Sequence, residues 1–261
     1  MRVLAPLLLS LASATAAASA PRGGYFSPID LSQPFGTRSA WQFTASQGSD
    51  IPDPLGGGED EDKAPGAIRL CVSKNAGQTC RPDLENLLTP STGRDLFSEP
   101  HFLNDVRIVQ PGAHRKLLLL QVASLHGGNG DQRMATVVLA YDRAKDTFVP
   151  VYEKQTGRNN NQEIRYIDDG PLQGSMISAE PTNNAPFGFW ITVNKLARGD
   201  YKQALKYRSA TRYGDGNTLA VIDSEMPNIE QRLGLWHPGS KLPLPRGQCR
   251  NPRLVRRELW C

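Results

Sequence analysis

The sequence predicts an all-β, mainly antiparallel fold, a β-meander closed into a sandwich or a barrel, with little helix. Two observations support this prediction. From Val106 onward, apolar and β-branched runs follow one another at short intervals, and helical periodicity is nearly absent. The connections between these runs, such as 142–146 and 195–200, have hairpin length and are too short for a crossover between parallel strands.

The first 20 residues have the pattern of a secretory signal peptide. Arg2 supplies a basic n-region, 3–11 form an apolar stretch, and 16–20 are small residues that suit cleavage after Ala18 or Ala20. We therefore expect the mature chain in a periplasm or outside the cell. No later stretch approaches the ~20 apolar residues of a spanning helix, so we expect no membrane span.

Residues 21–66 are rich in Pro and Gly and predict a loop-rich N-terminal segment with one short strand at 40–45. An antiparallel β domain is expected over 67–240. It opens with a short strand at 67–72 and one or two helical turns at 82–88. A basic tail is expected at 241–261.

The remaining strands of the domain follow in close succession. They are predicted at 103–109, 116–125, 134–142, 147–154, 162–167, 173–179, 187–194, 200–207 and 218–223.

Side-chain patterns place some of these strands within the sheet. In 200–207, alternation predicts Tyr201, Leu205 and Tyr207 on one face and the basic side chains on the other. The strand at 116–125 is apolar on both faces and should be central. Pro150 places its strand at an edge or at a bulge, because proline cannot donate to the ladder.

A weak internal repeat relates 146–148 to 200–201, at an offset of about 53 to 55 residues. It makes 106–109, 164–167 and 219–222 equivalent strands. Four strands per repeat is the size of a propeller blade, but a propeller needs at least four blades. An incomplete propeller-like arrangement is therefore the alternative to the sandwich or barrel.

The four cysteines predict two disulfides in an oxidising compartment. Short loops close most easily, which favours Cys71 with Cys80 and Cys249 with Cys261 over the two long-range pairings. A zinc site would need closer ligand spacing. No metal and no cofactor are expected.

Strand parity predicts a binding rim. In a meander, successive connections alternate between the two ends of the sheet, so the loops near residues 126, 158, 183 and 215 share one end. Rigid scaffolds carry binding chemistry on such loops, although turn preference alone also selects Asn, Asp and Gly. The predicted ligand-binding residues are His126, Asn129, Asp131, Arg158, Asn159, Asn160, Asn161, Asn183, Asn184, Tyr213, Asp215 and Asn217.

Catalysis at this rim is the alternative. Ser124 and His126, two residues apart on one strand, with Asp131 in the next loop, suggest a nucleophile, a base and an orienting group, but a direct Ser-His bond is awkward at that spacing. Glu163 and Glu180, together with Asp131 and Asp215, could supply paired carboxylates for glycoside cleavage. Calcium is a further alternative at 128–131 and 214–217, where oxygen ligands gather without the EF-hand framework.

The formal net charge of +4 says little about partners, and nucleic acid is not expected outside the cytoplasm. The sequence therefore predicts a non-catalytic, extracytoplasmic binding protein of the cell envelope, whose ligand is a glycan or a protein partner. A secreted hydrolase acting at the same rim is the alternative. The sequence does not predict an oligomeric state.

Overall fold

A computed structural model describes the greater part of the chain. It covers residues 26–56, 63–88, 99–126, 132–155, 162–182, 188–209 and 221–241, with the backbone alone of 253–255 and 258–260.

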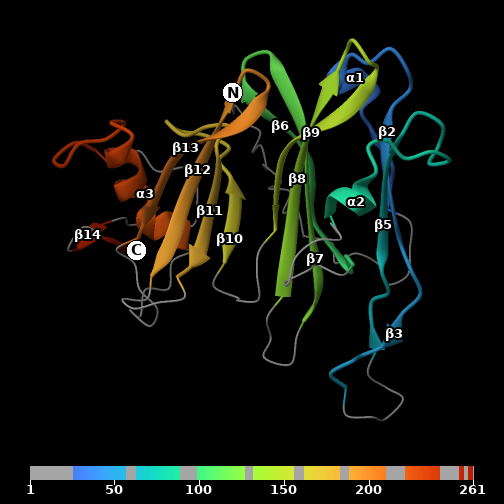
Figure 1. The fold of residues 1–261 in the computed structure, drawn as a ribbon, viewed down its shortest axis with the longest axis horizontal. Helices are drawn as coiled ribbons and strands as arrows, with labels where there is room; N and C mark the ends of the chain where they lie inside the picture. Colours follow the sequence, from blue (N-terminus) through green and yellow to red (C-terminus); the bar gives the residue numbers. More distant parts are fainter. Residues whose placement is uncertain are drawn as a thin grey trace, which may run out of the picture.

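The three larger sheets, all antiparallel, stack face to face, and one helix covers the outer face of the last of them (Figure 1). The N-terminal sheet contains β1 (Ile29–Asp30), β2 (Gln42–Gln47) and β5 (Ile68–Ser73). The central sheet contains β6 (Phe102–Gly112), β7 (Arg115–His126), β8 (Gln132–Asp142) and β9 (Thr147–Gln155). The C-terminal sheet contains β10 (Glu163–Tyr166), β11 (Met176–Pro181), β12 (Phe189–Ala197) and β13 (Asp200–Arg208).

The smaller elements lie at the margins of this stack. They are the helices α1 (Ser32–Phe35), α2 (Leu84–Leu88) and α3 (Val221–Arg232), and the two-stranded pairs β3 (Ile51–Pro52) with β4 (Lys63–Ala64) and β14 (Arg253–Val255) with β15 (Glu258–Trp260). In the described part of the chain, no helix is long and apolar enough to cross a bilayer.

The predicted all-β antiparallel fold is confirmed, and it is a sandwich-like stack. Each four-stranded sheet is an up-and-down meander with free first and last strands among the described elements, so neither closes into a barrel. The two meanders, β6–β9 and β10–β13, correspond to the two units of the weak repeat. β2 and β5 pair across the boundary expected at residue 66.

The central sheet is buried on both faces, as the sequence predicted for its strand at 116–125. Leu118, Leu120 and Val122 of β7 pack toward the N-terminal sheet, where they meet Trp41 and Phe43. Leu117 and Leu119 belong to a second core shared with the C-terminal sheet. Alternating side chains of one strand therefore supply two hydrophobic cores, which explains the continuous apolar run.

The strand predicted at 218–223, and with it a third repeat unit at 219–222, is wrong in its described part. Residues from Val221 onward form α3. Ile222, Met226 and Ile229 recur at helical spacing, are fully buried, and cover the outer face of the C-terminal sheet. The prediction failed because the short β-branched start of this segment resembles a strand. The apolar outer face of the C-terminal sheet is instead covered by the apolar side of a helix.

The predicted shared face for Tyr201, Leu205 and Tyr207 is also wrong. Tyr201 packs in the core between the two four-stranded sheets, whereas Leu205 and Tyr207 pack toward α3. The register shifts where Val193 pairs with Leu205 and Asn194 pairs with Gln203, so β13 contains one extra residue. Such a bulge reverses the alternation along a strand.

Pro150 lies in an edge strand with a bulge, as its chemistry predicted. β9 is the last strand of the central sheet, and its register shifts where Val138 pairs with Tyr152 and Leu139 pairs with Pro150. Val151 and Tyr152, although consecutive, both belong to the core facing the C-terminal sheet. The bulge therefore turns Tyr152 toward that sheet.

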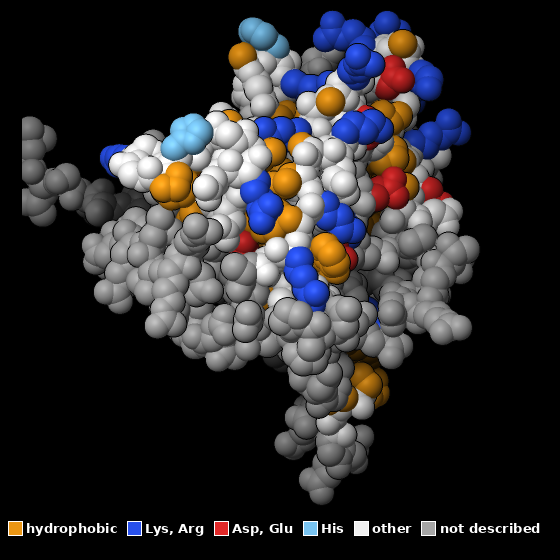
Figure 2. Space-filling view, turned by 60° about the vertical axis from the view of Figure 1, so that its left-hand side comes forward, with side chains coloured by type: hydrophobic (Ala, Val, Ile, Leu, Met, Phe, Trp, Pro, Cys, Tyr) orange, Lys and Arg blue, Asp and Glu red, His pale blue; other side chains and the backbone are white. Residues whose placement is uncertain are grey.

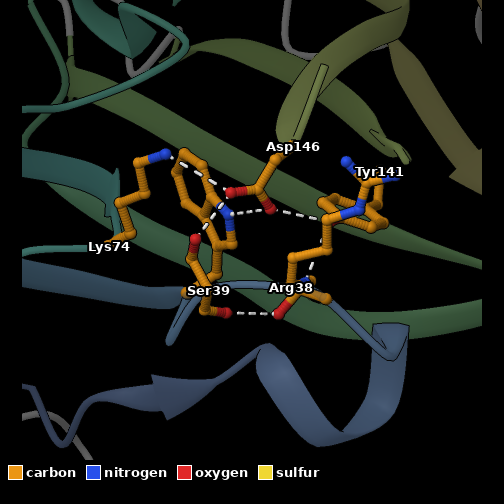
Figure 3. Close-up of polar contacts among 7 residues, drawn as sticks. Arg38, Ser39, Lys74, Tyr141 and Asp146 are labelled. Atoms are coloured by element: carbon orange, nitrogen blue, oxygen red, sulfur yellow. Dashed lines mark hydrogen bonds and ion pairs between the residues drawn. The ribbon is translucent and has the colours of Figure 1, made fainter. Parts of the chain in front are cut away.

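Asp146, in the turn between β8 and β9, ties this turn to the N-terminal sheet (Figure 3). Its carboxylate accepts hydrogen bonds from Ser39 Oγ at 2.6 Å, Tyr141 Oη at 2.7 Å and Trp41 Nε1 at 3.2 Å. Lys74 Nζ lies 3.3 Å from the same group. The hydrogen bonds, led by that from Ser39, hold the pKa of Asp146 far below its usual range.

The predicted disulfide between Cys71 and Cys80 is present, with the two Cα atoms 5.0 Å apart. It joins the end of β5 to the loop that precedes α2. Cys249 and Cys261 lie outside the described residues, so their pairing stays a prediction.

Candidate binding groove

The predicted rim requires the ends of alternate strands to lie at the same end of the stack, and the described strand ends are arranged in this way. An ion pair between Lys154 and Glu180 brings the C-terminal parts of β9 and β11 together. At the other end of the stack, Arg115 Nη2 donates a hydrogen bond of 3.2 Å to the Gly199 carbonyl, which joins the first hairpin of one sheet to the last hairpin of the other.

Most of the predicted rim residues lie outside the described residues. These are Asn129, Asp131, Arg158, Asn159, Asn160, Asn161, Asn183, Asn184, Tyr213, Asp215 and Asn217. Both calcium candidates, 128–131 and 214–217, lie there too. His126 is described and exposed at the end of β7, where its ring is 6.2 Å from that of Phe102. The rim itself stays a prediction.

The structure does not support a shared face for Ser124 and His126. The pairing of β7 with β8 shifts register between Ala123 and His126, so simple alternation does not hold at this point. Ser124 Oγ donates to the Leu125 carbonyl at 2.7 Å and accepts from the Arg133 backbone N–H at 3.1 Å. Both partners are backbone groups, so the Ser124 hydroxyl stabilises the ends of β7 and β8.

Glu163 and Glu180 are not brought together, because they lie on opposite faces of the C-terminal sheet. Glu163 faces α3 and accepts a hydrogen bond of 3.1 Å from the Ile222 backbone N–H. It also pairs with Arg165, which in turn contacts Asp223 of α3. Glu163 therefore anchors the start of the helix, where a carboxylate complements the helix dipole.

Glu180 instead lines a groove that sequence analysis missed. The groove, of about 550 Å³, runs between the edge strand β9 and the inner face of the C-terminal sheet. Its volume lies in the range of small-ligand sites. Its polar lining includes Tyr152, Lys154, Ser178, Glu180, Thr192, Asn194, Gln203 and Lys206.

Two hydroxyl groups of this groove are buried without a hydrogen-bond partner. Tyr152 is 9% exposed and Ser178 is 1% exposed, and neither Tyr152 Oη nor Ser178 Oγ has a partner. Buried polar groups are almost always hydrogen-bonded, since an unmade bond costs about 1 to 3 kcal/mol. The groove therefore carries unused hydrogen-bonding capacity.

The neighbouring tyrosines fix the position of Tyr152. Its ring contacts that of Tyr201 edge-on, with centroids 5.5 Å apart, and Tyr201 Oη donates to the Gly174 carbonyl at 2.8 Å. Burial, helped by the Glu180 carboxylate, raises the pKa of Tyr152 above its usual value. The Tyr152 hydroxyl therefore keeps its proton and can act as a donor.

The groove contains charges of both signs. Lys154 on β9 pairs with Glu180 on β11, and the lining also contains Glu153, Asp200 and Lys206. Basic side chains are more frequent than acidic ones on the described part of the face in Figure 2. In the groove lining, however, the three acidic side chains slightly outnumber the two basic ones, and one Lys-Glu pair is already formed.

Trp190 lies on the same sheet face as the groove, two residues before Thr192 on β12. It is exposed, at 42%, and the Lys206 ammonium lies 5.6 Å from its ring centroid. Trp190 pairs with Glu180 in the β-ladder, so an exposed aromatic side chain neighbours a residue of the groove lining.

The described lining offers mainly hydrogen-bonding groups. Ser178 has no base within hydrogen-bonding distance, and Thr192 and Asn194 offer neutral polar groups. Within the described ranges, no group of His, Cys, Asp and Glu side chains could hold a metal ion. Neither a nucleophile-base pair nor a metal centre is therefore assembled by the described residues.

Sequence reasoning missed the groove because two sheets and two bulges create it. The polar residues Ser178, Thr192 and Asn194 alternate with buried apolar ones, which was the one available signal, but a solvent-exposed face has the same pattern.

No family model, curated protein or solved structure matches the chain, so the geometry of the site is the basis for its interpretation.

Proposed function

We propose that the chain is a non-catalytic binding protein of the cell envelope that holds a neutral glycan in the groove between β9 and the C-terminal sheet. The observation that carries the proposal is that Tyr152 and Ser178, two residues of the groove lining, have buried hydroxyls without partners. A ligand rich in hydroxyl groups would supply the missing partners.

The rest of the lining supports a sugar in particular. The side-chain amides of Asn194 and Gln203 can both donate and accept hydrogen bonds, as a hydroxyl group does. Trp190 offers an exposed ring on which the apolar face of a sugar can stack. The matched charges of Lys154 and Glu180 favour a neutral ligand over a strongly charged one.

The predicted rim and the predicted signal peptide complete the proposal. The loops near residues 158 and 183 directly follow β9 and β11, the strands that carry Lys154 and Glu180, and we include them in the proposed binding surface. Mass spectrometry of the mature chain should find its N-terminus at Ser19 or Pro21. An intact Met1 on a cytoplasmic protein would contradict the proposed compartment.

The test of glycan binding uses variants that each remove one hydroxyl group. The probes are immobilised neutral oligosaccharides, followed by calorimetric titration of those that bind. Tyr152→Phe and Ser178→Ala should each weaken binding about 3- to 10-fold, the value of one neutral hydrogen bond. Tyr166→Phe is the matched control, because Tyr166 has an equally unpartnered hydroxyl in the same core but does not line the groove.

Three outcomes would contradict the proposal. The first is that no oligosaccharide binds, and the second is that Tyr166→Phe weakens binding as much as Tyr152→Phe. The third is cleavage of a bound oligosaccharide, seen as new products by mass spectrometry, which would support the hydrolase.

Replacing Asn159, Asn160 and Asn161 together by Ala tests the rim. It should weaken capture and change the melting temperature little, because exposed loop side chains contribute under about 0.5 kcal/mol.

A further inference from the structure

We infer that a second pocket, at the end of the stack opposite the predicted rim, binds an oxyanion group such as phosphate, sulfate or carboxylate. This basic pocket has a volume of about 570 Å³ and lies between α1, the β6–β7 hairpin and the β8–β9 hairpin. The residues that define its chemistry are Phe35, His114, Arg115, Lys116, Tyr141 and Arg143.

The basic pocket concentrates positive charge without a compensating acid. Arg115, Lys116 and Arg143 line it, and its described lining contains no Asp or Glu. Figure 2 shows Lys and Arg side chains gathered over the upper part of the molecule, where these two hairpins lie in Figure 1. Like charges held around a concavity repel one another, and a bound anion would relieve that repulsion.

Some basic side chains elsewhere in the described structure are paired with acids. Arg107 contacts Asp105 and Asp168, and Lys74 contacts Asp146. In the part of the chain that the structure describes, neither Lys116 nor Arg143 makes an ion pair. Within the described residues, these two charges of the basic pocket therefore have no acidic partner.

Local geometry holds one of the basic groups in place and sets a second beside α1. Arg115 Nη2 donates to the Gly199 carbonyl at 3.2 Å, which fixes this guanidinium at the end of β7. The Arg143 guanidinium lies beside Gly36, the left-handed residue that ends α1, at 3.8 Å from where a β-carbon would stand. Guanidinium groups bind phosphate, sulfate and carboxylate through paired N–H donors.

One wall of the basic pocket is aromatic. Phe35 packs edge-on against Phe148, with ring centroids 5.0 Å apart, and the Tyr141 hydroxyl is held by Asp146 and by the Arg38 backbone N–H. Both rings are therefore fixed by contacts outside the pocket. A ligand that carries a ring next to its anionic group would contact this wall, so the preferred ligand is an oxyanion attached to an apolar body.

The test compares two probes at low ionic strength, inorganic phosphate and phenyl phosphate. In ¹H–¹⁵N NMR titrations of the full chain, both should shift the backbone amides of 112–116 and 143. Phenyl phosphate should bind more tightly than inorganic phosphate, because its ring reaches Phe35. Lys116→Gln and Arg143→Gln should each weaken binding about tenfold or more, as expected for loss of a charge-assisted hydrogen bond.

The matched control is Lys145→Gln. Lys145 lies on the same hairpin as Arg143 and is exposed, but it does not line the basic pocket. Its loss should change phosphate binding less than twofold. An equal loss in Lys145→Gln, or shifts spread over the whole basic surface, would show attraction by net charge and overturn the inference. Tyr152→Phe should leave phosphate binding unchanged, which separates this site from the glycan groove.

Discussion

The Asp146 carboxylate accepts a 3.2 Å hydrogen bond from the indole Nε1 of Trp41, and it thereby joins a turn of the central sheet to a core residue beside the N-terminal sheet. Ser39 and Tyr141 donate to the same carboxylate. The two elements are 105 residues apart in the chain, so this contact stabilises the tertiary stack rather than a local turn.

Replacing Asp146 should therefore make stability less dependent on acid pH. Hydrogen bonds lower the pKa of Asp146 in the folded state below its ordinary value of 3.8. The resulting stability is present above pH 4 and is lost as the pH falls further, because the unfolded chain then binds the proton more readily. Asp146→Asn, which tolerates the left-handed backbone there, should lower the melting temperature at pH 7 and flatten its decline below pH 4.

A double-mutant cycle provides the control for this prediction. Ser39→Ala removes one donor to Asp146 and should lower the melting temperature in the native background. The same substitution should have little further effect in Asp146→Asn. Additive effects of the two substitutions would show that Ser39 acts independently of Asp146.

The three core tyrosines between the four-stranded sheets should respond differently to loss of the hydroxyl group. Tyr152 and Tyr166 have unpartnered hydroxyls, and burial raises the pKa of Tyr166 to about 12. Tyr152→Phe and Tyr166→Phe should each raise the free energy of unfolding by about 1 kcal/mol, because they remove an unsatisfied buried group. Tyr201→Phe should lower it by about 1 kcal/mol, because its hydroxyl is bonded to Gly174. Urea unfolding measures all three. Destabilisation by Tyr152→Phe would indicate that its hydroxyl already has a partner in the free protein.

Glu230 on α3 should make the fold less stable as the pH rises from about 4.5 to about 7. It is 1% exposed, neither carboxylate oxygen has a hydrogen-bond partner, and burial raises its pKa from 4.5 to about 7. The folded state holds the proton more tightly, so stability is greatest below the unfolded pKa and declines until the folded pKa is passed. At 1.36 kcal/mol per pKa unit, the loss is on the order of 3 kcal/mol.

Glu230→Gln tests this prediction. It should flatten the profile of unfolding free energy between pH 4.5 and pH 7 and stabilise the protein at pH 8. Glu85→Gln on the exposed side of α2 is the control and should leave the profile unchanged. A native-like decline in Glu230→Gln would assign the pH dependence to another group.

Opening the disulfide between Cys71 and Cys80 should destabilise the chain moderately. The two residues are 9 apart in sequence, and loop-closure entropy for so short a loop corresponds to about 2 to 3 kcal/mol. The double variant Cys71→Ser/Cys80→Ser should lose this amount in urea unfolding, and a reducing agent should destabilise the native chain by this amount more than it destabilises the variant. Non-reducing peptide mapping should also link Cys249 to Cys261. A peptide joining Cys71 to Cys261 would overturn the local pairing.

Much of the fold could be predicted because local chemistry dictates it. All eight strands of the two meanders were predicted from apolar alternation, hairpin-length connections and Pro150. The disulfide was predicted from the spacing of Cys71 and Cys80. The failures occur at 201–207 and 221–232. A single extra residue in β13 changed which face Tyr201 occupies, and the start of α3 has the composition of a strand.

The candidate site was less predictable than the fold. Glu163 and Glu180 both looked available for chemistry, yet pairing of β10 with β11 places them on opposite faces of one sheet. The sequence did not indicate a role for Tyr152 or Ser178. A hydroxyl group loses its water partners only when the folded chain buries it, so its lack of a partner cannot be seen in the sequence.

The sequence by itself determined the eight strands of the two meanders and which positions are apolar, because backbone sterics and side-chain burial act over a few residues. The tertiary structure decided that three sheets stack, that Asp146 meets Trp41, and that a polar groove opens beside β9. These features depend on register, and a one-residue bulge reverses the direction of every side chain beyond it at almost no change in local composition.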